Sequence, residues 1–130
     1  MATSTDTQPW RILIVDDDPA VRAALQFALE LEGFGVDVYP SGEALLTASL
    51  PPDHACLVLD ERLSGISGME TLRLLRQRGV ALPAIFITSH PNPHFRTLAA
   101  MAGAPILEKP LIGDGLMGSI REALSPPSIL

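Results

Sequence analysis

Short apolar runs alternate along this chain with segments of helical periodicity. Unbroken apolar runs at residues 12–15, 56–59 and 84–88 predict strands buried on both faces, because they offer no polar position that could face water. The alternating segment 34–39 and the short run 106–107 predict two further strands. The pattern therefore predicts five strands.

A helix is predicted after each strand. Pro19, preceded by an acid that can cap the helix, begins the first, which ends at Gly33. Ser41 caps a short second helix that ends near residue 49. Apolar residues at helical spacing predict three more helices, at about residues 69–78, 95–102 and 116–124.

The alternation of strands and helices indicates an α/β fold. Because crossovers between parallel strands are right-handed, helices should cover both faces of a parallel sheet in a three-layer, doubly wound (flavodoxin-like) architecture. By precedent among such sheets, the expected strand order is 2-1-3-4-5. The proline-rich segment 90–93 is expected to be a loop before the fourth helix.

Length and composition favour a single domain. The chain has 130 residues, and 47% of them are hydrophobic. This is enough to form one hydrophobic core, but the chain is too short for two domains of ordinary size. We expect this domain at residues 10–124. A polar leader at residues 1–9, expected to be disordered, precedes it, and a short tail at residues 125–130 follows.

Charge and sequence signals narrow the class of protein. A net charge of −6 argues against direct nucleic-acid binding, because nucleic-acid binders usually carry a basic face. The single cysteine, Cys56, lies in a predicted buried strand and is expected to pack as a small apolar group. No apolar run approaches the roughly 20 residues that cross a bilayer, and residues 1–10 do not resemble a signal peptide. We expect a cytoplasmic protein without membrane contact.

Polar residues stand at the points where the predicted strands end. Asp16 and Asp17 follow the first strand, Asp60 the third and Lys109 the fifth, while Thr88 ends the fourth. In a parallel sheet these ends share one edge, where α/β proteins bind ligands. Crowded carboxylates either share a proton or bind a hard divalent cation, for which Mg²⁺ is the intracellular candidate. Thr88 and Lys109 could donate to an anion beside that cation, and a phosphoryl group fits this role.

Four segments at these strand ends together resemble the receiver domain of two-component response regulators. They are ILIVDDDP at residues 12–19, LDERLSGISG at 59–68, IFITS at 85–89 and LEKP at 107–110. Each segment alone is a weak signal, and their order at successive strand ends makes the match specific. The resemblance covers about residues 10–124.

The resemblance implies roles for the acidic residues. Asp60 would accept a phosphoryl group from a sensor histidine kinase or a histidine phosphotransfer protein. Asp16, Asp17 and Asp60 would bind Mg²⁺ together with the backbone carbonyl of Arg62. Two roles stay open for Asp18, which can cap the first helix or bind the metal. The protein would phosphorylate and dephosphorylate only itself, so it would not be an enzyme with a separate substrate.

The resemblance also implies how the site is completed and read. Thr88 and Lys109 would contact the phosphoryl oxygens, and Arg62 and His90 would tune the attack of water. Phosphorylation would then alter the face formed by the fourth helix, the fifth strand and the fifth helix. Ile106 occupies the switch position on that face.

This chain departs from the family pattern at two positions and in the length of one segment, because residues 103–109 are one residue shorter than the common pattern. Ser64 stands where proline is usual, and Ile106 stands where an aromatic residue is usual. The resemblance is also compatible with a homodimer through the face of the fourth and fifth helices. The apolar segment 98–101 of the fourth helix fits either burial in the core or an exposed patch for a partner or a second copy.

Two other functional classes compete with a phosphorylated receiver. The first is an interaction module that keeps the fold and signals by contact alone. The second is a phosphohydrolase of the haloacid dehalogenase type. Like that family, this chain has two acids separated by one residue, Asp16 and Asp18, directly after a strand, and a threonine and a lysine later in the sequence. The small number of acids later in the sequence argues against this phosphohydrolase, because only Asp114 and Glu122 remain downstream as candidate metal ligands.

Overall fold

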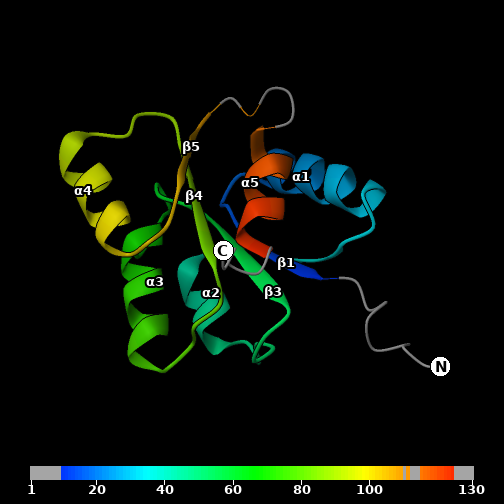
Figure 1. Ribbon diagram of the computed structural model, residues 1–130, viewed down its shortest axis with the longest axis horizontal. Coiled ribbons are helices and arrows are strands. Elements are labelled where there is room, and N and C mark those ends of the chain that lie inside the picture. The colour runs from blue at the N-terminus through cyan, green and yellow to red at the C-terminus, as the bar shows by residue number, and fades with distance from the viewer. Residues whose placement is uncertain (1–9, 110, 112–114, 125–130) are drawn as a thin grey trace, which may run out of the picture.

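The computed structural model of the protein describes residues 10–109, 111 and 115–124. The leader at residues 1–9 and the tail at residues 125–130 lie outside the described residues. Within the described part of the chain, five strands and five helices alternate, and the helices flank a central sheet (Figure 1).

The strands form one parallel sheet. They are β1 (Arg11–Val15), β2 (Gly35–Tyr39), β3 (Ala55–Asp60), β4 (Ala84–Thr88) and β5 (Ile106–Glu108). The helices are α1 (Pro19–Leu31), α2 (Gly42–Thr47), α3 (Gly68–Gln77), α4 (Pro93–Met101) and α5 (Gly115–Leu124). The strand order is β2-β1-β3-β4-β5, and every neighbouring pair is parallel. The doubly wound fold predicted from the sequence is therefore confirmed.

Side chains of the central strands alternate between two apolar layers. On one face, Leu45 of α2, Leu72 of α3 and Phe95 of α4 pack with the sheet. On the other face, Leu29 of α1 and Ile120 of α5 do so. Figure 1 shows the same division, with α1 and α5 on one side of the sheet and α3 and α4 on the other. Each fully buried aliphatic side chain contributes about 1.5–3 kcal/mol, so the two layers fix the positions of the strand ends.

The start of α4 differs from the prediction. The helix begins at Pro93, so the prediction that residues 90–93 are all loop was wrong. The Asn92 side chain accepts a hydrogen bond from the Phe95 N–H at 2.8 Å, and Pro93 takes a first-turn position where a missing N–H costs nothing. Phe95 and Ala99 of this helix are buried, whereas Met101 is 79% exposed. Burial therefore explains only part of the apolar character of α4.

Cys56 lies in the central strand β3 and is fully buried. Burial raises the pKa of its thiol to about 12. The residue therefore packs as an apolar group, as predicted.

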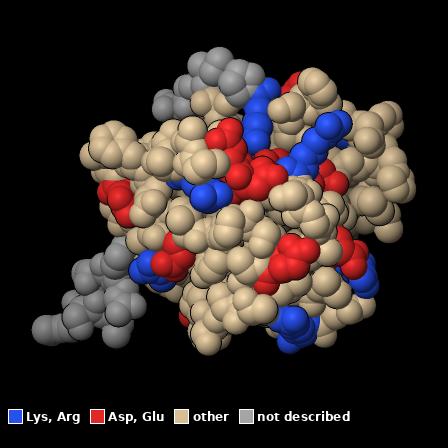
Figure 2. All heavy atoms as spheres, turned by 180° about the vertical axis from the view of Figure 1, so that it is seen from behind, with Lys and Arg blue, Asp and Glu red and all other residues tan. Residues whose placement is uncertain are grey.

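The surface of the described residues carries charges of both signs. Figure 2 shows acidic and basic side chains close to one another on one face, without a continuous basic area among the coloured residues. None of the described helices has the length and apolar character needed to span a membrane.

Candidate functional site

Two buried carboxylates lie together at the carboxyl edge of the sheet. Asp16 follows β1 and is 0% exposed, and Asp60 ends β3 and is 4% exposed. Their strands are neighbours in the sheet, so the topology brings these distant residues together. Burying a carboxylate is costly unless a cation or hydrogen-bond donors compensate the charge.

Lys109 supplies a positive charge to both acids. Its Nζ lies 2.9 Å from Asp60 Oδ2 and 3.3 Å from Asp16 Oδ2. The backbone N–H of Lys109 donates to the Thr88 carbonyl at 2.8 Å, which fixes the chain after β5 against the end of β4. The structure thus brings together Asp16, Asp60 and Lys109 at the edge where the sequence predicted them.

Asp17 adds a third carboxylate to the site. Oxygen atoms of Asp16, Asp17 and Asp60 lie within 4.8 Å of one another. The single Lys109 ammonium pairs with Asp16 and Asp60, so it can balance only one of the three charges that the fully ionised cluster would carry. The donor atoms are all carboxylate oxygens, which hard cations such as Mg²⁺ and Ca²⁺ prefer. The residues present therefore fit a hard divalent cation.

The charges of this cluster perturb one another. Burial raises the pKa of Asp60 above its ordinary value; the hydrogen bond from Lys109 opposes this rise and the charge of Asp16 adds to it. For Lys109, burial acts to lower the pKa, but the hydrogen bonds and charges of Asp60 and Asp16 outweigh burial and raise it. Lys109 is therefore protonated at neutral pH. A further cation would favour the ionised form of Asp60.

The segment after β1 is held by its own hydrogen bonds. Asp16 Oδ1 accepts from the Asp18 N–H at 2.9 Å, and Asp18 Oδ1 accepts from the Ala20 N–H at 2.9 Å. The Arg22 guanidinium donates to the Asp16 carbonyl at 2.8 Å. Of the two roles left open for Asp18, the structure shows the cap of α1.

The loop after β3 is packed tightly against Asp60. The Arg62 N–H donates to Asp60 Oδ1 at 3.1 Å, and Glu61 Oε1 accepts from the Met69 N–H at 2.9 Å. A Cβ atom at Gly68 would overlap the Asp60 carbonyl oxygen, so only glycine fits at the start of α3. These contacts hold the backbone that carries the Asp60 carboxylate in place.

The remaining predicted residues differ in their burial and in their contacts. Thr88 is 2% exposed and is joined to Lys109 through the backbone. The Nδ1 atom of His90 lies 2.8 Å from the Ser89 carbonyl oxygen, so the ring lies against its own backbone. Ile106 pairs with Phe86 in the sheet and packs in the layer beneath α4. Thr88 is therefore buried next to the site, whereas Ile106 is half-buried and packs against the core.

Two contacts around the site were not predicted. The Ser64 N–H donates to Asp17 Oδ2 at 3.1 Å, and the Ile66 N–H donates to Glu43 Oε2 at 3.1 Å. Each contact joins residues far apart in the sequence and depends on the shape of the loop. In the sequence, Gly65 indicates a turn and Glu43 indicates the start of a helix. No sequence pattern indicates that the loop around Gly65 contacts Glu43.

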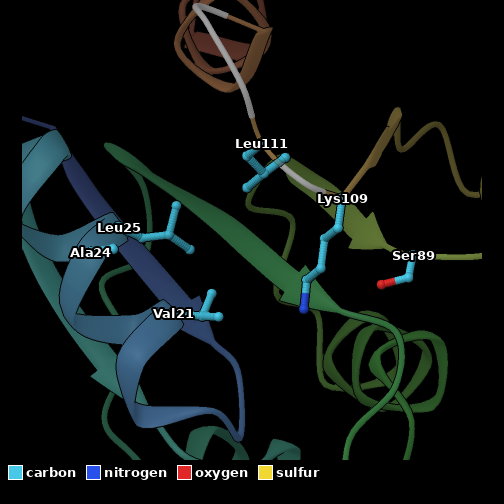
Figure 3. Close-up of a pocket in the computed structure, with 6 residues that line it drawn as sticks. All are labelled: Val21, Ala24, Leu25, Ser89, Lys109 and Leu111. Atoms are coloured by element: carbon cyan, nitrogen blue, oxygen red, sulfur yellow. The ribbon is translucent and has the colours of Figure 1, made fainter.

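An apolar pocket adjoins the acidic cluster. It has a volume of about 480 Å³ and opens beside Lys109. Figure 3 shows side chains of α1 on one side of it and Lys109 on the other, with the Lys109 ammonium directed toward the end of β3. Its lining residues are Val21, Ala24, Leu25, Ser89, Lys109 and Leu111. The cluster thus has an apolar wall formed mainly by α1.

The fold and the site define a flavodoxin-like domain with an acidic cluster able to hold a metal ion and a lysine at its sheet edge. The sequence model of the response regulator receiver domain matches residues 12–121. The chain therefore belongs to the family of receiver domains of two-component response regulators. This assignment confirms the resemblance seen in the sequence and replaces the phosphohydrolase alternative.

Individual relatives agree with this assignment. The transcriptional regulatory protein FixJ of Azorhizobium caulinodans is 38% identical over 112 residues, which are 85% of this chain and 53% of that protein. The crystal structure of FixJ-N has a TM-score of 0.82 and 33% identity and covers 95% of this chain and 100% of that one. The response regulator TrrA from Thermotoga maritima, in complex with Mg²⁺-BeF, has a TM-score of 0.75 and 28% identity, covering 88% and 99% of the two chains. This chain spans about half the length of the FixJ that it matches.

Proposed function

We propose that Asp60 accepts a phosphoryl group from the phosphohistidine of a sensor kinase or of a phosphotransfer protein. The observation that supports this most strongly is the position of Lys109, whose ammonium lies 2.9 Å from Asp60 Oδ2 inside an acidic cluster. A fixed positive charge beside the accepting oxygen stabilises the negative charge that develops on a transferring phosphoryl group.

Mg²⁺ is the metal proposed for the acidic cluster. Asp16, Asp17 and Asp60 would hold it with their carboxylates, and the backbone carbonyl of Arg62 would complete the protein ligands. Bound there, the ion would supply positive charge to neutralise the phosphoryl oxygens. Two observations support this choice, the three neighbouring carboxylates and the Mg²⁺-BeF complex of the related TrrA.

The proposed reaction is a covalent transfer. A carboxylate oxygen of Asp60 attacks phosphorus, a P–O bond forms, and the P–N bond to the donor histidine breaks with its electron pair left on the imidazole. Thr88 and Lys109 donate hydrogen bonds to the phosphoryl oxygens. Water later hydrolyses the acyl phosphate and restores Asp60. Arg62 and His90 lie on exposed loops, and their proposed role is to tune that step. The protein modifies only itself, so we do not propose an enzyme with a separate substrate.

The donor is proposed to approach over α1. Val21, Ala24 and Leu25 form an apolar wall next to Lys109, and a partner surface could cover it while its phosphohistidine reaches Asp60. Such a partner is a kinase or phosphotransfer domain in the cytoplasm, where we place this reaction. An Ala24→Glu variant is expected to lose transfer from the protein donor while keeping labelling by a small phosphodonor.

Labelling with acetyl phosphate tests the assignment of Asp60. In the presence of Mg²⁺ we expect one phosphoryl group per chain by mass spectrometry and none with excess chelator. Asp60→Asn should abolish labelling, whereas Asp53→Asn, a change of an exposed acid outside the site, should not. Persistent labelling of the Asp60→Asn variant would overturn the proposal.

Phosphotransfer profiling against autophosphorylated sensor kinases extends this test to the physiological donor. At least one kinase should transfer its phosphoryl group to the wild-type chain within minutes. If neither the kinases nor acetyl phosphate label the protein, the domain acts instead as a contact-only module.

We also propose that phosphorylation changes the face formed by α4, β5 and α5 and that a second copy binds there. Ala100 of α4 is exposed and lines a hollow together with Ile106 of β5, which leaves an apolar surface available for such a contact. Light scattering with and without beryllofluoride, a phosphoryl mimic, measures the association. A monomer in both conditions rules this dimer out, and Ala100→Glu should weaken any dimer that forms.

A further inference from the structure

Asp17 has a second partner besides the acidic cluster. Its Oδ2 accepts a hydrogen bond from the Ser64 N–H at 3.1 Å and a longer one from the Ser64 hydroxyl at 3.4 Å. A carboxylate offers about four acceptor positions, so these two contacts leave room for a metal. The contact joins the segment after β1 to the loop after β3.

The loop that carries Ser64 is held on both sides of this residue. Upstream, the Arg62 N–H donates to Asp60 Oδ1 at 3.1 Å, and downstream the Ile66 N–H donates to Glu43 Oε2 at 3.1 Å. The Ser64 N–H is therefore presented from a fixed position. An exposed carboxylate such as that of Asp17 would otherwise rotate among several rotamers.

We propose that Ser64 is a positioning residue for the cation site. Its backbone N–H, assisted by the hydroxyl, holds the Asp17 carboxylate beside Asp16 and Asp60, so that a divalent cation meets a prearranged set of ligands. Outer hydrogen-bond partners orient metal ligands in this way in other metal sites. The inference rests on the proposed cation site, and the experiment below separates the two.

The backbone N–H is the stronger of the two donors. The amide contact has an ordinary length for an N–H···O hydrogen bond, whereas 3.4 Å is long for an O–H···O bond. Removing only the hydroxyl should therefore have a small effect. Removing the N–H, which proline does, should have the larger one.

Mg²⁺ titration followed by ¹H–¹⁵N NMR tests this ranking without any phosphodonor. Relative to wild type, we expect Ser64→Thr to bind Mg²⁺ equally and Ser64→Ala to bind within about 2-fold. Ser64→Pro should bind Mg²⁺ roughly 5-fold more weakly. Loss of a hydrogen-bond partner of a metal ligand typically lowers metal affinity by about 10- to 100-fold, and we expect a smaller effect here because Ser64 is exposed. A dispersed spectrum and a cooperative thermal transition without metal show that each variant is folded.

A measurement on the metal-free protein tests the contact directly. Asp17→Ala should accelerate hydrogen exchange of the Ser64 amide by about 3- to 10-fold, the change expected for loss of one ordinary hydrogen bond. Asp18→Asn is the matched control. It changes the neighbouring exposed acid, whose carboxylate caps α1 through the Ala20 N–H, and should leave Ser64 exchange unchanged.

The outcomes are distinct. Failure of wild type to bind Mg²⁺ overturns both the proposed cation site and this inference. If wild type binds Mg²⁺ but Ser64→Pro binds it equally well or more tightly, only the role of Ser64 is wrong. Unchanged Ser64 exchange in Asp17→Ala overturns that role even if the proline variant does not fold.

Discussion

Replacing Lys109 with methionine removes the ammonium that lies between two buried acids. Asp16 and Asp60 are almost fully buried, while the Lys109 side chain is 22% exposed. Removing one partner from a buried ion pair typically costs about 3–5 kcal/mol, because the other charge stays buried without compensation. The partial exposure of Lys109 places the expected loss near the lower limit, at about 3 kcal/mol without metal. For a domain of this size the thermal midpoint should fall by roughly 10 °C or more.

The loss should depend on pH. Burial already raises the pKa of Asp60, and removal of Lys109 takes away the hydrogen bond that opposes this rise. A carboxyl group with a higher pKa in the folded than in the unfolded protein binds more protons when folded. Its contribution therefore favours folding at low pH and is lost as pH rises from about 4 toward the folded pKa. Lys109→Met should be closer to wild type in stability at pH 5 than at pH 7.5.

Urea unfolding followed by circular dichroism, with chelator present, measures these differences. The double variant Asp60→Asn with Lys109→Met should recover part of the loss, because it removes the charge of Asp60 while Asp16 keeps its hydrogen bond from the Asp18 N–H but stays buried without the ammonium. Arg11→Met is a control that breaks an exposed ion pair with Asp37 and should cost under about 1 kcal/mol. Equal stability of Lys109→Met and wild type at pH 7.5, or an equal loss at both pH values, would refute the reasoning.

Three further predictions concern the support of the site and the core. Gly68→Ala should destabilise the fold by about 1–3 kcal/mol in urea unfolding and slow labelling by acetyl phosphate, because the new Cβ overlaps the Asp60 carbonyl. Phe95→Ala should lower the free energy of unfolding by about 3–5 kcal/mol in the same assay, because this buried ring packs edge-on against Phe86, with the two ring centroids 5.1 Å apart. The buried Cys56 thiol, with a pKa of about 12, should react with a thiol reagent only after unfolding, and rapid reaction in native buffer would contradict its burial.

The strands and the location of the site could be predicted because both follow from simple geometry. Buried parallel strands need unbroken apolar runs, and the runs in this chain are bounded by polar residues. Because the carboxyl ends of such strands share one edge, residues as distant as Asp16, Asp60 and Lys109 had to be neighbours. The hydrogen bonds of Lys109 to both acids agree with that expectation.

Loop contacts could not be predicted in the same way. The contact between Ser64 and Asp17 uses a backbone N–H, and every residue except proline has one. Which N–H meets which carboxylate depends on loop dihedral angles that side-chain periodicity does not encode. The start of α4 was missed for a related reason, since Pro93 can end a helix or begin one and only the Asn92 cap decides between them.

Burial of the strand ends affects the stability of this domain and the chemistry of its site in opposite ways. The apolar layers on both faces hold Asp16 and Asp60 at fixed positions, yet the same burial makes their negative charge unfavourable. When all three carboxylates are ionised, Lys109 compensates one of their charges and leaves two. A divalent cation would offset that excess, and a phosphoryl group on Asp60 would change it again. The charge state of the cluster can therefore alter the energy of the whole strand edge, because the fold leaves these acids little freedom to move away.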